Sequence, residues 1–167
     1  MNKALQDIIE PGGICYGCGP SNPLGIQIKS YWDEDGQRVV ATVIPDPKYT
    51  GWPNLVYGGF LAMVVDCHSN WTSIAHHYRA EGRAPGSLPG IHCVTGKLGV
   101  KYLKPTPMGV PLHLSAWVEG EVGRKTRVMC EVRAGDELTV VGDSVFVRVD
   151  TNALAEQAHQ NAPGREL

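Results

Sequence analysis

The feature that most constrains the fold is one long helical candidate in a chain whose other segments have the pattern of strands. Residues 57–79 contain no proline, and their apolar residues recur every three or four positions, which is the period of an amphipathic helix. The next segment, "AEGRAPGSLPG", is rich in proline and glycine, which end helices. The sequence therefore predicts a single central helix.

The segments around this helix are predicted to be strands. Before it, residues 26–32 and 38–45 flank the turn "DEDGQ" and indicate a hairpin, whereas residues 46–54 are expected to be irregular. After it come four β-like segments, at residues 91–103, 110–122, 124–134 and 137–149. One helix cannot cover both faces of such a sheet. We therefore expect an α+β domain in which a curved antiparallel sheet of about six strands wraps around the helix, with edges that need an oligomeric partner.

The domain organisation follows from length and loop composition. The 167 residues fit one domain. Residues 1–24 are expected to be an N-terminal extension, with a short helix followed by a loop that contains Cys15 and Cys18. Residues 25–150 are predicted to be the folded domain and residues 151–167 a C-terminal tail.

Composition and charge argue against several classes of protein. The formal net charge is −2 and no dense basic patch is present, which argues against nucleic-acid binding. No apolar stretch reaches the ~18 residues of a membrane span or has the form of a signal peptide. The five cysteines, an odd number, favour reduced thiols over a disulfide framework. We therefore expect a cytoplasmic protein that binds neither nucleic acid nor membranes.

Two glycines open the predicted helix, and an acid follows two turns later. The N–H groups of Gly58 and Gly59 have no partner within a helix, and without a Cβ they can approach a ligand oxygen closely. The helix dipole adds partial positive charge at the same end, which suits a developing oxyanion. Asp66 follows the apolar run "FLAMVV", where a carboxylate is either paired or functional.

The alternative interpretation of Asp66 is a helix face exposed to solvent. Asp66 shares a stripe with Asn70, Ser73 and His77, at spacings of three or four residues. His68 cannot be its acid–base partner, because residues two apart on a helix point to different sides. The pattern alone leaves both the solvated face and the functional acid open.

Several motifs occur in the order found in one protein family. The stretch "YGGFLAMVVD" places an acid seven residues after the second glycine, and four others accompany it: "CYGCGPSNPLGI", "TGWPNLVYGG", "VKYLKPTPMG" and "GRKTRV". On these motifs, the chain resembles the hotdog-fold acyl-CoA thioesterases of the PaaI-like (phenylacetate-pathway) branch over residues 15–149. It departs from the family at Tyr57, where the hallmark residue is histidine.

The resemblance implies a hotdog fold and a homodimer, or a dimer of such dimers, whose subunits join edge to edge. The N–H of Gly58, with Gly59 beside it, would polarise the thioester carbonyl. Asp66 of the facing subunit would attack that carbonyl or activate a water. Thr95, ten residues before the proline of the "YLKP" motif, would help to place the water. Tyr57 would line the site and narrow it.

Further residues are candidates for substrate binding. Asn70 lies one turn after Asp66 on the same stripe. The resemblance places Arg124, Lys125 and Lys104 near the phosphates of the coenzyme, and cationic side chains suit phosphate. The alternative for each of these cations is a solvated charge at the end of a strand.

No metal site is predicted. Cys15 and Cys18 have the spacing of half a structural zinc site, but such a site needs about four ligands and no second pair follows. We expect the two thiols to pack inside a tight loop. No organic cofactor is expected either, because coenzyme A is part of the substrate.

The predicted function is hydrolysis of the thioester of an acyl- or aroyl-coenzyme A. The alternative is a non-catalytic hotdog protein that binds acyl-coenzyme A as a sensor or carrier, and Tyr57 supports this alternative. A hotdog hydratase or dehydratase is disfavoured. Those enzymes pair an acid with a histidine four or five positions later, where this chain has Asn70 and Trp71.

Overall fold

The protein is described by a computed structural model over residues 3–150 of the 167, so the predicted tail at 151–167 lies outside the described residues. The elements are α1 (Leu5–Ile9), β1 (Ser30–Trp32), β2 (Val39–Val43), a 3₁₀ helix (Pro47–Tyr49), β3 (Thr50–Trp52), β4 (Leu55–Val56), α2 (Gly58–Ala80), β5 (His92–Lys97), β6 (Val100–Tyr102), β7 (Leu112–Val118), β8 (Lys125–Ala134) and β9 (Glu137–Val149). No helix in this part of the chain is both long and apolar enough to cross a membrane.

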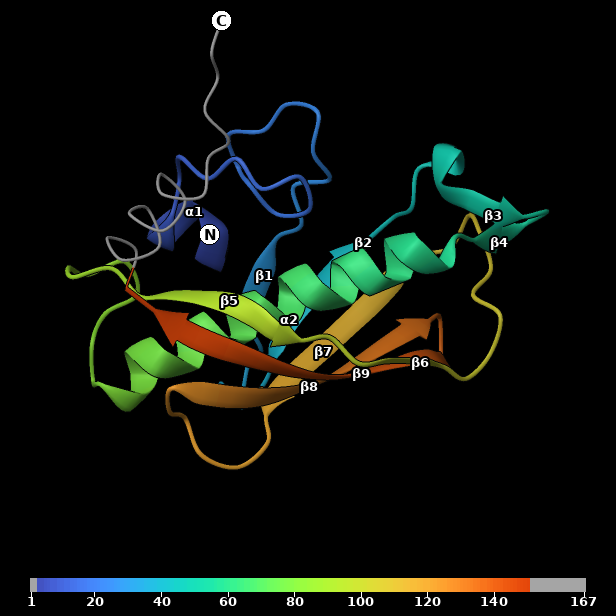
Figure 1. Cartoon of the computed structure of the whole chain (residues 1–167). Helices are drawn as coiled ribbons and strands as arrows, with labels where there is room; N and C mark the ends of the chain where they lie inside the picture. Colours follow the sequence, from blue (N-terminus) through green and yellow to red (C-terminus); the bar gives the residue numbers. More distant parts are fainter. Residues whose placement is uncertain (1–2, 151–167) are drawn as a thin grey trace, which may run out of the picture.

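The strands form one large antiparallel sheet that curves around α2 (Figure 1). Its order is β1-β2-β7-β8-β9-β5, and β6 lies beside β9 after β5. A second sheet contains only β3 and β4. This arrangement confirms the α+β hotdog architecture expected from the sequence. It also places β5 at an edge of the large sheet.

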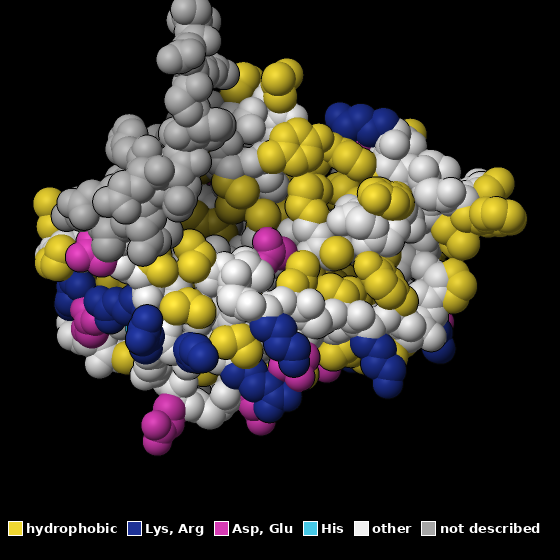
Figure 2. All heavy atoms as spheres, viewed as in Figure 1, with side chains coloured by type: hydrophobic (Ala, Val, Ile, Leu, Met, Phe, Trp, Pro, Cys, Tyr) yellow, Lys and Arg dark blue, Asp and Glu magenta, His cyan; other side chains and the backbone are white. Residues whose placement is uncertain are grey.

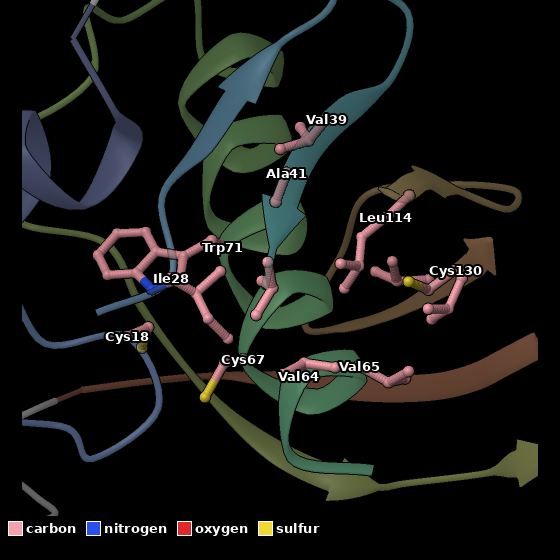
Figure 3. Close-up of a cluster of buried hydrophobic side chains, with 14 of the residues drawn as sticks. Cys18, Ile28, Val39, Ala41, Val64, Val65, Cys67, Trp71, Leu114 and Cys130 are labelled. Carbon is pink, nitrogen blue, oxygen red and sulfur yellow. The ribbon is translucent and has the colours of Figure 1, made fainter. Parts of the chain in front are cut away.

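The central helix is held against the sheet by its apolar face. Val64 and Val65 are both fully buried, and burying such a side chain contributes about 1.5–3 kcal/mol. Figure 3 shows them on the side of α2 that faces Leu114 and Cys130. Gly142 of β9 lies beneath the helix, and a Cβ there would be 2.5 Å from Val65 Cγ1. The glycine therefore permits the close approach of helix and sheet.

A buried polar network ties the N-terminal elements to α2. The side chain of Gln6 donates to Ser30 Oγ at 2.9 Å, and Ser30 Oγ lies 2.9 Å from His68 Nδ1. His68 Nε2 lies 3.0 Å from the carbonyl oxygen of Val39. A neutral imidazole protonated at Nε2 satisfies every member of this chain, so His68 is structural and, as expected, does not pair with Asp66.

The stability of the fold is expected to depend on the neutral form of His68. Burial lowers the pKa of His68 from 6.5 to about 4, although the bond to the Val39 carbonyl opposes this shift. The unfolded state therefore binds the proton more readily. The contribution of neutral His68 to the free energy of unfolding is fully present above pH 6.5 and is lost as the pH falls from 6.5 towards 4. We expect the free energy of unfolding in urea to fall by about 2–3 kcal/mol between pH 7.5 and 4.5 from this residue alone.

The test compares the wild type with His68→Gln over the same pH range. The variant should have a smaller pH dependence of unfolding free energy, because it has no imidazole to protonate. His113→Gln is the control, since His113 is an exposed histidine on β7. Equal losses of stability in the wild type and His68→Gln would contradict the assignment.

Three expectations about local structure were wrong. The irregular segment at 46–54 contains the 3₁₀ helix and β3, and β3 pairs with β4. The single strand expected at 91–103 is divided into β5 and β6, and the resulting seven strands of the large sheet are in keeping with the expected number of about six. Both segments pair with β9, with a register shift between Thr95 and Lys97, and the Asp143 N–H donates to the Gly99 carbonyl at 2.9 Å between them. A Cβ at Gly99 would lie 2.6 Å from the Asp143 carbonyl oxygen, so glycine permits this close approach to β9.

The first strand is also shorter than predicted. The N–H groups of Ile26 and Ile28 donate to the carbonyls of Tyr16 and Gly17, at 2.8 and 3.0 Å. These residues therefore pair with the N-terminal loop, and β1 begins only at Ser30. The loop is thereby held against the domain.

Candidate active site

The predicted acid on α2 is paired with a threonine on the edge strand. Asp66 is half-buried, and Thr95 Oγ1 donates a hydrogen bond to its Oδ1 at 2.7 Å. Two further contacts join the same helix face to β5: Asn70 Nδ2 donates to the Cys93 carbonyl at 3.1 Å, and Ser73 Oγ lies 3.7 Å from Cys93 Sγ. The stripe that contains Asp66 is therefore a contact with β5, and Ser73 is buried rather than solvated.

The surroundings of Asp66 favour its protonated form more than water does. Burial raises the pKa of Asp66 above its ordinary value, and the negative charge of Cys15 in its thiolate form adds to the rise. The hydrogen bond from Thr95 acts in the opposite direction, because it stabilises the carboxylate. A carboxylate with a raised pKa and a fixed orientation is suited to accept a proton from water.

The N-terminus of α2 offers free N–H groups. Tyr57 occupies the N-cap position in an extended conformation, and no side chain caps the helix. The N–H groups of the first turn, including those of Gly58 and Gly59, therefore face outward from the helix end. Tyr102 of β6 donates from its hydroxyl to the Gly58 carbonyl at 2.7 Å, which fixes the orientation of this peptide. Sequence reasoning did not identify Tyr102, although it lies within the "VKYLKP" motif.

The aromatic ring of Tyr57 lies across the second glycine. A Cβ at Gly59 would be 2.4 Å from Tyr57 Cζ, so this position accepts no side chain while the ring stays in place. Tyr57 is itself 54% exposed. The ring therefore lies beside the glycine opening of α2, and a narrowing of the site by Tyr57 stays a prediction.

A pocket of about 270 Å³ lies at this helix end. Its lining includes Gly58, Leu61, Tyr102 and Lys104. Figure 2 shows hydrophobic side chains gathered on this face around the start of α2 and the β3–β4 hairpin, with Lys and Arg side chains along its lower margin. An apolar surface bordered by cations suits a ligand with an apolar and an anionic part.

Within one chain, the helix end and the acid are too far apart to act together. Gly58 and Asp66 are eight residues apart on one helix, which corresponds to about 12 Å along its axis. If a thioester carbonyl oxygen accepts a hydrogen bond from the Gly58 N–H, its carbonyl carbon cannot also lie next to the Asp66 carboxylate of the same chain. The structure thus brings Asp66 and Thr95 together and leaves Gly58 and Gly59 separate from them.

The predicted cations also fall into two groups. Lys104 lies at the start of α2 and forms an ion pair with Glu137. Arg124 lines a different hollow, of about 360 Å³, with His77 and Arg148 near the end of α2. Lys125, the first residue of β8, is exposed beside it. One chain therefore does not gather the three cations at one site.

The two polar atoms of the Asn70 side chain have different surroundings. Its amide nitrogen is used in the contact with β5, but its Oδ1 is buried without a partner among the described residues. A buried acceptor of this kind is suited to an ordered water near Asp66.

Comparison with proteins of known structure gives matches that cover most of the chain. A thioesterase superfamily protein from Shewanella loihica PV-4 is 34% identical, with a TM-score of 0.60, over 74% of this chain and 91% of that chain. A Bacillus halodurans protein whose structure was solved with CoA is 25% identical, with a TM-score of 0.57, over 75% of this chain and 76% of that chain.

Comparison with curated sequences finds relatives that are named as acyl-coenzyme A thioesterases. The bovine (Bos taurus) acyl-coenzyme A thioesterase THEM4 is 25% identical over 134 residues, which are 79% of this chain and 50% of that protein. The chain spans about half the length of the curated relatives it matches. No protein-family model matches the chain.

Proposed function

The chain belongs to the thioesterase superfamily, and from that premise we propose that it hydrolyses the thioester bond of an acyl- or aroyl-coenzyme A. The observation that carries this proposal is the Thr95–Asp66 hydrogen bond of 2.7 Å on a half-buried helix face. The carboxylate is oriented there beside a sheet edge, where a second subunit can reach it. The relatives named as acyl-coenzyme A thioesterases and the neighbour solved with CoA support the substrate class.

The active site is proposed to be shared between two subunits. Because Gly58 and Asp66 are about 12 Å apart on one helix, the amide of one subunit would work with the acid of the other. Edge strand β5, which carries Thr95 and the 39% exposed Val94, would form the contact. Two antiparallel copies of α2 would place the start of one helix near the middle of the other. The same pairing would bring Lys104 of one subunit towards Arg124 of its partner.

The proposed reaction consumes one water for each thioester. The N–H groups at Gly58 and Gly59 would stabilise the oxyanion that forms when the carbonyl carbon is attacked. In one route, Asp66 takes a proton from water as the water oxygen attacks, the carbon–sulfur bond breaks and coenzyme A leaves as the thiol. In the other route, the Asp66 carboxylate attacks the carbonyl carbon and the carbon–sulfur bond breaks, so that coenzyme A leaves as a thiolate and takes a proton from water. A water molecule then hydrolyses the resulting anhydride to the carboxylic acid and free Asp66. Thr95 would hold the carboxylate, and water at Asn70 Oδ1 would lie close to it.

The test is a measurement of thiol release from a panel of short-chain, long-chain and aromatic acyl-coenzyme A esters. We expect turnover of at least one class, with stoichiometric free coenzyme A and carboxylic acid. Release of thiol that is no faster than the uncatalysed rate across the whole panel would contradict hydrolysis.

Thr95 is expected to act through the orientation of Asp66. Thr95→Val keeps the shape of the side chain but removes the donor, so we expect kcat to fall about 10-fold, the equivalent of one hydrogen bond. Thr95→Ser, which retains the hydroxyl, should restore most of the rate, and KM should change little in both variants. Equal rates for the valine and serine variants would exclude a role for the hydroxyl.

A second candidate function is binding of acyl-coenzyme A without hydrolysis. The observation that favours it is the ring of Tyr57, which lies against Gly59 where a thioester oxygen would approach. A sensor or carrier would bind the panel in a titration and release no thiol. Tyr57→His, which installs the hallmark residue of the family, would then create or increase turnover.

We also propose the domain organisation, the oligomeric state and the compartment of the protein. Residues 25–150 would form the catalytic domain, and residues 1–24 an extension packed on it through the buried Leu5 and Gln6. The enzyme would act as a homodimer in the cytoplasm, where the reduced state of its five free cysteines is maintained. The hydrolysis itself would require no organic cofactor.

A further inference from the structure

Three cysteines from distant parts of the chain meet beside α2. Cys15 and Cys18 belong to the N-terminal loop and Cys67 to the helix, and their sulfur atoms all lie within 4.8 Å of one another. Cys15 Sγ is 3.9 Å from Cys67 Sγ. Figure 3 shows the Cys67 side chain extending from α2 towards the segment that carries Cys18.

The spacing of the sulfurs matches that of thiolates around one metal ion. Zinc–thiolate bonds of about 2.3 Å in a tetrahedral arrangement put the sulfurs about 3.8 Å apart. The Cys15–Cys67 distance of 3.9 Å already has this value. Only a small contraction of the remaining distances would therefore be needed.

The loop around the sulfurs is shaped for close approach. A Cβ at Gly17 would lie 2.3 Å from Cys67 Sγ, so any other residue would push the loop away from the helix. The Gly19 N–H donates to the Cys15 carbonyl at 2.8 Å, which holds the loop in shape.

We propose that Cys15, Cys18 and Cys67 bind one thiophilic cation, for which Zn²⁺ is the probe, through three thiolate ligands and a fourth position open to solvent. Each thiol loses its proton to water when it binds, and no electron is transferred. The exposed Cys15 leaves a path for the ion to enter. The expectation of no metal site was based on the absence of a second closely spaced pair of ligands, and Cys67 is a single cysteine about fifty positions away in the sequence.

A bound ion would fasten the N-terminal loop to the helix next to Asp66. Cys67 follows Asp66 directly in α2. The ion would therefore hold one wall of the candidate active site in place without taking part in the hydrolysis.

The test is titration of the reduced, metal-free full-length protein with Zn²⁺ in competition with a chromophoric chelator, and with Co²⁺ monitored by its thiolate charge-transfer absorption. We expect one ion per chain. Cys15→Ala and Cys67→Ala should each weaken Zn²⁺ binding by at least about 100-fold. The exposed position of Cys15 makes its variant safe for folding even if Cys67→Ala proves unstable.

Cys93→Ala is the matched control, because Cys93 is a buried cysteine outside the cluster and should leave Zn²⁺ affinity unchanged. The proposal would be overturned by equal Zn²⁺ affinity in the wild type and Cys15→Ala. It would equally be overturned by a wild type that takes up no Zn²⁺ at micromolar concentration, or by a Cys15–Cys67 disulfide that persists under the reducing conditions of the titration.

Discussion

Asp66→Asn is expected to lower kcat by about 10³-fold while the fold and the ligand site remain intact. Asparagine has the shape of aspartate and still accepts the hydrogen bond from Thr95 through its Oδ1. It cannot take a proton from water, however, and it is a poor nucleophile. The loss should therefore appear in kcat, whereas affinity for coenzyme A should change only slightly.

The measurement is steady-state thiol release, together with circular dichroism and a coenzyme A titration. Asp46→Asn is the matched control, because Asp46 caps the 3₁₀ helix far from Asp66 in sequence and asparagine serves equally well there. It should retain full activity. A kcat within a few-fold of the wild type for Asp66→Asn would remove this residue from the mechanism.

Gly58→Pro is expected to give the second largest effect, a decrease in kcat of about 10²–10³-fold. Proline removes the N–H that is proposed to stabilise the oxyanion. The first position of a helix tolerates proline, and the preceding Tyr57 already has the extended conformation that proline requires, with φ −61° and ψ 130°. The helix should therefore form normally, and the loss should be confined to catalysis.

The variant Gly58→Ala distinguishes the effect of losing the N–H from the effect of adding side-chain atoms. A Cβ at this position would make ordinary contact with the Tyr102 ring at 3.5 Å, and alanine keeps the N–H. We expect this variant to retain much more activity than Gly58→Pro. If both variants lose activity equally, the steric change rather than the lost donor is responsible.

Mixing the two inactive variants tests the shared active site. If Gly58 and Asp66 of different subunits work together, a dimer of one Asp66→Asn and one Gly58→Pro subunit contains one intact site and one site with both defects. Random reassociation should then restore about a quarter of the wild-type activity. An unchanged, additive rate after verified exchange of subunits would refute a site built between subunits.

The sequence alone was sufficient to predict the central helix and the spacing of the candidate site residues on it. The predicted helix at 57–79 agrees with α2 at Gly58–Ala80 to within one residue. This agreement has a local cause, because the period of the apolar residues and the absence of proline act over a few turns. The same local rules excluded a pairing of Asp66 with His68. They failed for β3 and β4, whose short pairing in a proline-containing segment carries a weak pattern.

The family motifs also allowed one residue far from Asp66 in the sequence, Thr95, to be predicted as part of the site. They indicated Thr95 as a partner in the site, and the structure places its hydroxyl on Asp66. The interpretation of the helix stripe as a solvated face was wrong for Ser73 and His77, which are buried. Periodicity identifies which residues share a helix face, but it does not identify what covers that face.

What the sequence determined by itself was thus the local structure: the helix, its glycine opening and the acid eight residues after Gly58. The tertiary structure decided which distant residues meet. The register of β5 against β9, with Thr95 opposite Phe146, brings Thr95 to Asp66, and the path of the N-terminal loop brings Cys15 and Cys18 to Cys67. Such meetings depend on packing between segments tens of residues apart, and no local pattern of residues encodes that packing.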